Sequence, residues 1–424
     1  MTTLETSTTG AVVGGRTGAR RWKLPVVYGV LTLIALVLFV VLGRDGSATF
    51  SLSGGAATGL PPVLLPARGT GIVVTVLALA IAVLSIRYTG ARRQPLWPPI
   101  VFALALVVGL LTWAASGGTV PVPGLLAGSL ALSVPLIFGA LGGVISERVG
   151  VVNVAIEGQL LAGAFAGALI GSLTKNVVVG LLAAAAAGVL VSFVLAAFAI
   201  RYLVDQVIVG VVLNVLVLGL TSFLYTAVLV PASSTLNSPP QLEPIAVPLL
   251  SAIPVLGPVL FDQTLIVYLM YIGVAAVTVG LFTTRWGLRL RAVGEHPQAA
   301  DTVGISVTGT RFWNVALAGA IAGLGGAYFT LAAVPSFSRN VTSGAGFIAL
   351  AAVIFGQWNP VRATLAALLF GFASNLQNVL GILDSPVPSD FLLMLPYVVT
   401  IFAVAGLVGQ VRGPAAAGKP YVKG

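Results

Sequence analysis

Long apolar runs alternate with short stretches rich in glycine, proline and charged residues along almost the whole chain. A helix of about 20 apolar residues crosses the hydrocarbon core of a bilayer, whereas a membrane β-barrel shows alternating segments of about ten residues. The pattern therefore predicts an all-α, polytopic transmembrane helical bundle of about 12 spans, within a range of about 10 to 12. We place these spans at residues 25–42, 70–86, 98–115, 125–145, 159–174, 177–199, 207–230, 264–282, 312–334, 345–357, 363–383 and 391–408.

The composition excludes a soluble protein. Of the 424 residues, 58% are apolar and only 8% are charged, and the mean hydropathy is +1.07. These values are typical of a membrane protein. The chain has no cysteine, which removes disulfides and thiolate chemistry. The single histidine, His296, has no metal-ligand partners at a useful spacing, so neither a metal site nor a catalytic triad is expected.

The positive charges predict the orientation of the chain. If the amino terminus is cytoplasmic, all 21 Lys and Arg residues except Arg44, Arg68, Lys175 and Arg339 fall on the cytoplasmic side. Cytoplasmic loops carry such an excess of positive charge. Both termini are therefore predicted to be cytoplasmic. The net charge of +10 serves this orientation, and no aromatic-rich basic surface indicates a nucleic-acid partner.

A polar island, RWGLRLRAVGEHPQAADTVGI at residues 285–305, lies between two apolar runs. Gly294 and Pro297 break the chain before a short predicted helix at residues 298–301. On the positively charged side of a membrane, such a helix can receive a push from a soluble partner. An ordinary solvated loop is the alternative interpretation.

A second stretch, SERVGVVNVAIEGQLLAGAFAGALIGS at residues 146–172, interrupts the helical pattern. Asn153, Glu157 and Gln159 lie between apolar residues, where an unpaired carboxylate or amide costs several kcal/mol. Broken helices that expose such groups form the solute sites of transporters. In the alternative interpretation, the stretch is a structural hinge in which Glu157 satisfies freed backbone N–H groups.

Further amides and one aromatic ring lie within the predicted spans. The amides offer paired donors and acceptors for a base edge or for ribose hydroxyls, and the ring offers a stacking face. Each alone is more often a contact between helices or a core residue. The predicted pathway for solute consists of Asn153, Glu157, Gln159, Asn214, Phe347, Asn375, Gln377 and Asn378.

Two motifs carry a resemblance to a known family. The island reads G-x-R-x-R-A-V-G-x-x-P-x-A-A-x-x-x-G-I from Gly287, and residues 153–164 read N-x-A-x-E-G-Q-x-x-x-G-A. Both resemble ABC importer permeases of the branched-chain amino acid and simple-sugar group, in its nucleoside-type arm. The likeness extends over residues 125–410 and departs from the family pattern at Gln357, where a lysine is usual.

The resemblance implies a permease subunit for nucleosides or related small polar solutes such as sugars, with no enzymatic activity of its own. It implies a separate ATPase subunit that binds ATP and magnesium, a second permease forming a hetero- or homodimer, and an extracytoplasmic solute-binding protein. This chain itself is expected to bind no cofactor and no metal, and to contact membrane lipid. The ATPase would dock on a coupling helix formed by Arg291, Gly294, Glu295, Pro297, Ala299, Ala300, Asp301 and Gly304.

The composition and the resemblance together predict a division of the chain, which is expected in the plasma membrane. Residues 1–24 would form a disordered cytoplasmic tail, and residues 25–120 an amino-terminal extension with about three transmembrane helices. Residues 121–410 would form the ABC permease transmembrane domain, and residues 411–424 a second cytoplasmic tail.

Two other classes of function stay open. An ion-coupled secondary transporter of a small polar solute would use Glu157 as its coupling group. A membrane-embedded enzyme would need several acids or histidines at one membrane face, whereas the acids here are scattered. GPAAAGK at residues 413–419 matches part of a phosphate-binding loop, but Pro420 replaces the required Ser or Thr. Any ATP hydrolysis is therefore expected in another subunit.

Overall fold

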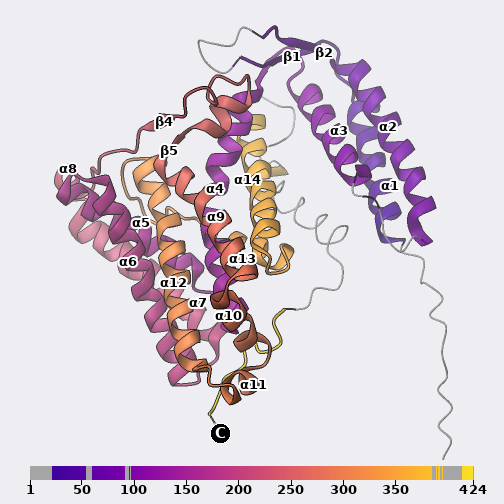
Figure 1. Ribbon diagram of the computed structural model, residues 1–424. Helices are drawn as coiled ribbons and strands as arrows, with labels where there is room; N and C mark the ends of the chain where they lie inside the picture. The colour runs from indigo at the N-terminus through magenta and orange to yellow at the C-terminus, as the bar shows by residue number, and fades with distance from the viewer. Residues whose placement is uncertain are drawn as a thin grey trace, which may run out of the picture. The chain divides into compact units, whose positions relative to one another are not determined.

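The computed structural model describes residues 22–53, 60–90, 95, 97–383, 388, 390–391, 394 and 413–423 (Figure 1). In this part of the chain, ten helices are long and apolar enough to cross a membrane, and helix makes up 73% of the structure. The protein is therefore a multi-pass, mostly helical membrane protein. The ten are α1 (Lys23–Ala35) continued by a π-helical turn (Leu36–Val41), α2 (Ala67–Arg87), α3 (Trp97–Ala114), α4 (Val122–Arg148), α5 (Ile156–Thr174), α6 (Val177–Ala196) continued by Ala197–Arg201, α7 (Gln206–Leu224) continued by Tyr225–Leu229, α9 (Leu265–Thr283), α12 (Val307–Ala327) continued by Tyr328–Ala333, and α14 (Pro360–Ile382).

Ten of the predicted spans coincide with these helices: those from 25–42 through 312–334 and the one at 363–383. The predicted span at 391–408 lies almost entirely outside the described residues, as does the predicted tail at 1–24. The number of spans beyond ten and the cytoplasmic placement of the termini stay predictions.

The prediction of a spanning helix at 345–357 is wrong. The helix found there, α13 (Ala345–Phe355), has 11 residues. At 1.5 Å per residue it is about 16 Å long, against roughly 30 Å for the hydrocarbon core. Apolar composition alone does not distinguish this short helix from a complete span.

The chain here consists of turns, bends and irregular segments at residues 334–344, followed by α13. Near the start of this segment, Phe337 exchanges hydrogen bonds with Asn237, in the connection that follows α7. Just beyond its end, the Trp358 indole N–H donates to Glu147 in the last turn of α4. A short helix preceded by turns and bends thus stands where the sequence predicted a continuous span.

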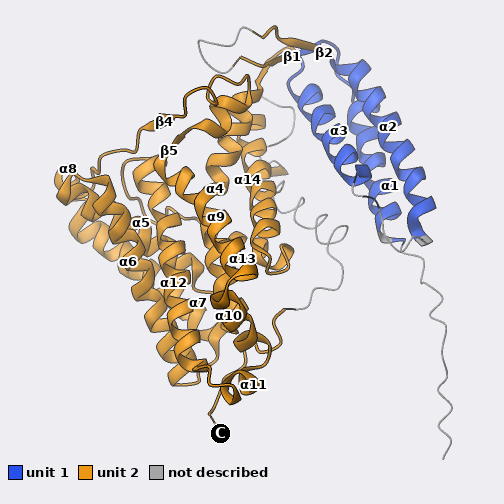
Figure 2. Cartoon of the chain, viewed as in Figure 1, with its two compact units in different colours: residues 1–48, 65–116 blue, residues 49–64, 117–424 orange. Residues whose placement is uncertain are grey.

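The described chain divides into two compact units (Figure 2). Unit 1 consists of residues 1–48 and 65–116 and holds α1 to α3 and, directly after α2, a short 3₁₀ turn at Tyr88–Gly90. Its core is small: the rings of Tyr28 and Phe102 lie 4.6 Å apart beside other buried apolar side chains. Unit 1 therefore has a hydrophobic core of its own.

Unit 2 consists of residues 49–64 and 117–424, and its centre is formed by α4, α5, α6 and α12. Gly323 of α12 lies against the backbone at Gly163 of α5 and at Gly188 of α6, where added Cβ atoms would overlap it. Because these glycines have no side chain, the three helices approach closely, as small residues allow in membranes.

Short strands and turns connect the long helices. These elements are β1 (Ser47–Ser51), β2 (Val63–Pro66), β3 (Thr119–Pro121), α8 (Ser233–Leu236), β4 (Pro244–Ala246), a π-helical turn (Gly257–Phe261) and β5 (Asp262–Thr264). β1 pairs in parallel with β3, and β4 pairs antiparallel with β5.

The polar island folds into two helices, α10 (Arg285–Glu295) and α11 (Pro297–Thr302). The predicted short helix corresponds to α11, whereas α10 was not predicted. α10 is amphipathic, with Leu290 and Val293 buried against unit 2 and Arg289 exposed. The island is thus a packed part of the fold and not a loose loop.

Candidate transport and coupling sites

The break between α4 and α5 is closed by side chains. Gly150 turns the chain with φ 94°, a conformation that favours glycine. The Ser146 hydroxyl donates to the Val151 carbonyl at 2.8 Å, and the Gln206 side chain accepts from the Val152 N–H at 2.7 Å. The backbone groups freed by the break are therefore hydrogen-bonded within the protein, as a membrane interior requires.

Asn153 and Gln159, both completely buried, bond each other across the break. The Asn153 amide donates to the Gln159 Oε1 at 3.1 Å, and the Gln159 amide donates to the Ser192 hydroxyl of α6 at 2.9 Å. The side-chain amides of both predicted pathway residues are therefore hydrogen-bonded within the protein, and their burial keeps them from contact with a solute.

Asn214 of α7 holds the other side of the break. Its amide donates to the Val154 carbonyl at 2.9 Å, and its Oδ1 accepts from the Gly158 N–H at 2.8 Å. One amide side chain therefore satisfies a carbonyl before the first turn of α5 and an N–H within it.

Glu157 caps α13. Its Oε1 accepts from the Thr342 hydroxyl at 2.6 Å and from the Gly344 N–H at 2.9 Å, and its Oε2 accepts from the Gly346 N–H at 2.7 Å. A carboxylate is stabilised at the positive end of a helix. The geometry is the one expected for the hinge interpretation, in which Glu157 satisfies freed backbone N–H groups.

The remaining predicted pathway residues do not join this cluster. Asn375 of α14 donates to the Leu125 carbonyl in the first turn of α4 at 2.7 Å. Phe347, in the first turn of α13, is 50% exposed. Gln377 is half-buried and Asn378 exposed, and within the described residues neither makes a hydrogen bond. The structure therefore brings together Asn153, Glu157, Gln159 and Asn214 at the break.

Sequence reasoning missed several partners of this cluster. Ser192, Gln206 and Thr342 each bond a residue of the break, yet each stands alone in its own stretch of sequence. The pattern Thr342-x-Gly344-x-Gly346 before an apolar run was the available signal, because a polar residue and glycines are typical of a helix start. The signal does not name Glu157 as the cap.

The predicted coupling residues divide into a buried and an exposed set. Gly294, Pro297 and Ala300 are buried, and Arg291 and Asp301 are half-buried, with Arg291 lying over the Phe282 ring at 5.4 Å. The predicted residues Glu295, Ala299 and Gly304 are exposed, and so are the neighbouring residues His296, Gln298, Thr302 and Val303, which were not predicted. The exposed residues are the ones most open to a docking protein.

Gly294 joins the island to the break. A Cβ at this position would overlap the Arg148 carbonyl oxygen at the end of α4 and would lie 3.3 Å from the Gly150 nitrogen. The end of α10 therefore touches the backbone where the break begins.

The carboxyl-terminal residues 413–423, predicted only as a tail, form a strap over the island. The Ala416 N–H donates to the Gly294 carbonyl at 2.9 Å, and buried Arg311 of α12 donates to the Lys419 carbonyl at 3.0 Å. Tyr421 is buried, and desolvation and the neighbouring Asp301 raise the pKa of its phenol. The strap therefore contacts α10, α11 and α12 and holds them together.

Comparison with known proteins defines the class of this fold and site. Residues 125–404 match the family described as branched-chain amino acid transport system / permease component. The chain belongs to this family and is a membrane permease of a transport system. The matched residues begin after α3, so the helices of unit 1 lie outside the match.

Several similar proteins are ABC transporter permeases. The guanosine ABC transporter permease protein NupQ of Bacillus subtilis (strain 168) is 41% identical over 305 residues, which cover 70% of this chain and 95% of the relative. The nucleoside ABC transporter permease protein NupC of Lactococcus lactis subsp. cremoris (strain MG1363) is 41% identical over 308 residues, 70% of this chain and 96% of the relative. A putative glucose ABC transporter permease protein, TsgC13 of Haloferax volcanii, is 36% identical over 254 residues, 60% of this chain and 77% of the relative. No solved structure matches the chain significantly. The predicted resemblance to nucleoside-type permeases is confirmed.

Glu157→Gln should destabilise the protein. The new NH₂ group faces backbone N–H groups of α13 in place of an acceptor, so one of them loses its partner. We expect a loss of about 1–3 kcal/mol, the usual effect of an unsatisfied buried donor, seen as a lower melting temperature of the detergent-solubilised protein. Glu243→Gln, at an exposed position, is the control and should leave the melting temperature unchanged. Equal stability of Glu157→Gln and the unaltered protein would show that the cap is dispensable.

Tyr421→Ala should loosen the island. Removal of a buried aromatic side chain costs on the order of 3 kcal/mol, enough to raise local opening by about tenfold or more. Hydrogen exchange of the backbone amides at residues 294–305 measures this opening. Val422→Ala is the matched control, because Val422 is 70% exposed. Exchange that is equally slow in both variants would mean that the strap does not brace the island.

Proposed function

We propose that this chain is the permease subunit of an ATP-binding-cassette importer for nucleosides, with sugars as the next class of solute. The relatives named for guanosine and for nucleosides, each at 41% identity, support the nucleoside class. The relative named for glucose, at 36% identity, supports the second. In this proposal the chain provides the route, and a separate ATPase subunit binds ATP and magnesium.

One observation carries the mechanism: a continuous series of contacts runs from the island to a broken membrane helix. Gly294 at the end of α10 abuts the end of α4. The break that follows leads within a few residues to Glu157, whose carboxylate holds the start of α13. A push on α10 is therefore transmitted to α13 through packed backbone and short hydrogen bonds.

The solute is proposed to meet the residues that the fold leaves open. Phe347 presents half of its surface at the start of α13, where its ring offers a stacking face for a base. Gln377 and Asn378 make no hydrogen bond within the described part of the chain, and their amide groups suit ribose hydroxyls or a base edge. Asn153, Gln159 and Asn214 then act indirectly, by fixing the break on which α13 rests.

The proposed assembly places both termini, α10 and α11 in the cytoplasm, in line with the distribution of Lys and Arg. The exposed residues Ala299 and Val303 there form the docking surface for the ATPase. A second permease and an extracytoplasmic solute-binding protein complete the transporter. The second permease is either a related chain or another copy of this one.

The source of energy tests this proposal. Uptake of labelled guanosine by cells expressing the transporter should be blocked by vanadate and should survive an uncoupler that collapses the proton gradient. An ion-coupled secondary transporter, the alternative with Glu157 as coupling group, should show the reverse. Uptake that the uncoupler alone abolishes would refute the ATP-driven mechanism.

Val303→Arg should weaken binding of the ATPase subunit while the permease still folds. Val303 is 74% exposed beside α11, so an arginine there is tolerated by the fold but is buried without a partner in a docked complex, which costs several kcal/mol. We expect the ATPase subunit to be lost on co-purification and uptake to fall by about tenfold or more. Leu249→Arg, in the connection between α7 and α9 and 89% exposed, is the control for co-purification. Unchanged co-purification with Val303→Arg would remove the docking surface from α11.

A further inference from the structure

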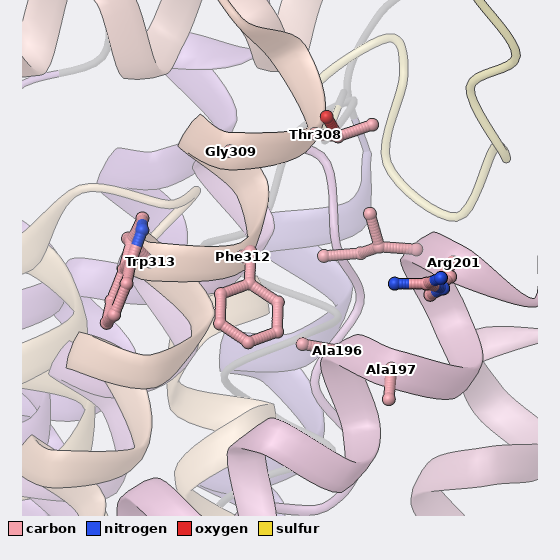
Figure 3. Close-up of a pocket in the computed structure, with 8 residues that line it drawn as sticks. Ala196, Ala197, Arg201, Thr308, Gly309, Phe312 and Trp313 are labelled. Carbon is pink, nitrogen blue, oxygen red and sulfur yellow. The ribbon is translucent and has the colours of Figure 1, made fainter.

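A groove opens where α6 ends and α12 begins (Figure 3). It has a volume of about 540 Å³. Both helices end their membrane-spanning segments here, at Arg201 and Val307, so the groove lies at the depth where the hydrocarbon core meets the lipid headgroups. Its lining consists of Ala196, Ala197, Ile200, Arg201, Thr308, Gly309, Phe312 and Trp313.

One side of the groove is an aromatic wall. The Phe312 ring stacks on Phe193 with centroids 5.2 Å apart, and the Trp313 ring meets Phe312 edge-on at 5.6 Å. Trp313 is nevertheless 67% exposed. Tryptophan at the end of a membrane helix is typical of the interfacial region, where its ring contacts acyl chains and its N–H remains near polar groups.

The other side carries an unpaired positive charge. Figure 3 shows the Arg201 guanidinium across the groove from Phe312 and Trp313. The nearest acid in sequence, Asp205, uses its carboxylate to cap α7, accepting from the Val207 N–H at 2.9 Å. Among the described residues, Arg201 has no ion pair and no hydrogen bond. A guanidinium in this position is suited to a phosphate group.

We propose that this groove binds an anionic phospholipid. The acyl chain lies along Phe312 and Trp313, and the headgroup phosphate lies between the Arg201 guanidinium and the Thr308 hydroxyl. The charge complementarity and the apolar wall together favour a lipid over a soluble anion, which would make no use of the wall. The proposal is independent of the solute and of the ATPase.

Bromine-labelled lipids test the proposal on the full-length protein in nanodiscs. Bromine in an acyl chain quenches the fluorescence of a tryptophan that it touches, and the Trp313 signal is the difference between the unaltered protein and Trp313→Phe. Brominated phosphatidylglycerol, at a low mole fraction in phosphatidylcholine, should quench Trp313 more than brominated phosphatidylcholine at the same mole fraction. We expect the difference to correspond to an approximately fivefold higher local concentration of phosphatidylglycerol beside Trp313. This factor corresponds to ~1 kcal/mol for one basic residue at an anionic lipid. Equal quenching by the two lipids would overturn the proposal.

Charge variants assign the preference to a residue. Arg201→Gln should abolish the enrichment of phosphatidylglycerol at Trp313 while general quenching by lipid remains. Arg362→Gln is the matched control, because Arg362 is an exposed arginine at the start of α14 that does not line the groove. Enrichment that persists in Arg201→Gln, or that is lost equally in Arg362→Gln, would refute a specific site.

Inorganic phosphate distinguishes a lipid from a soluble ligand. Millimolar phosphate at constant ionic strength should leave the enrichment of phosphatidylglycerol unchanged, because free phosphate gains nothing from the aromatic wall. Release of the lipid by phosphate would show that the groove is a site for a soluble anion, and the lipid proposal would be wrong.

Discussion

The structure depends on one constraint: a helix interrupted inside a membrane leaves backbone groups that no water can satisfy. The Glu157 carboxylate meets this constraint for α13, since its two oxygens accept from Gly344, Gly346 and the Thr342 hydroxyl. Glu157 lies in the first turn of α5, the helix that follows the break after α4. Two interrupted helices are thus held together by a single charged side chain. A carboxylate suits this position because one charge faces the positive end of a helix, whereas a neutral amide would offer weaker acceptance and a competing donor.

Close backbone contact extends this interaction beyond the membrane-spanning part. Gly346 lies so near the Glu157 backbone that a Cβ would overlap it, and Gly294 lies equally near the Arg148 carbonyl. Neither contact passes through a flexible side chain. Packed elements of this kind move as bodies and do not deform gradually. In the proposed mechanism, these contacts would pass a displacement of α10 to the end of α4, and the Glu157 side chain would carry it from α5 to the start of α13.

The sequence was sufficient for features that depend on local composition and insufficient for those that depend on partners. The spans follow from apolar runs, and α11 follows from Pro297 and the polar residues around it. The run at 345–357 has the same composition but forms a half-length helix, because its cap comes from Glu157, nearly two hundred residues earlier in the chain. For the same reason the sequence suggested Asn153, Gln159 and Asn214 as solute ligands: a buried amide has the same appearance in sequence whether it bonds a neighbouring helix or a solute. The strap at 413–423 has no apolar period, so only the tertiary structure reveals that it packs.

The first turns of α12 are where these separate features meet. Arg311 bonds the strap through the Lys419 carbonyl, and Asn314 accepts from the Trp286 indole of α10 at 2.9 Å. Phe312 and Trp313, which lie between Arg311 and Asn314 in the sequence, form the aromatic wall of the groove. Successive residues of a helix point in different directions, so one turn of α12 contacts the strap, the island and the membrane boundary at once. This arrangement gives the island a second attachment besides Gly294. α12 in turn packs through Gly323 against α5 and α6. In the proposed mechanism, a push on the island would therefore be divided between the break at Glu157 and the glycine-packed centre of unit 2.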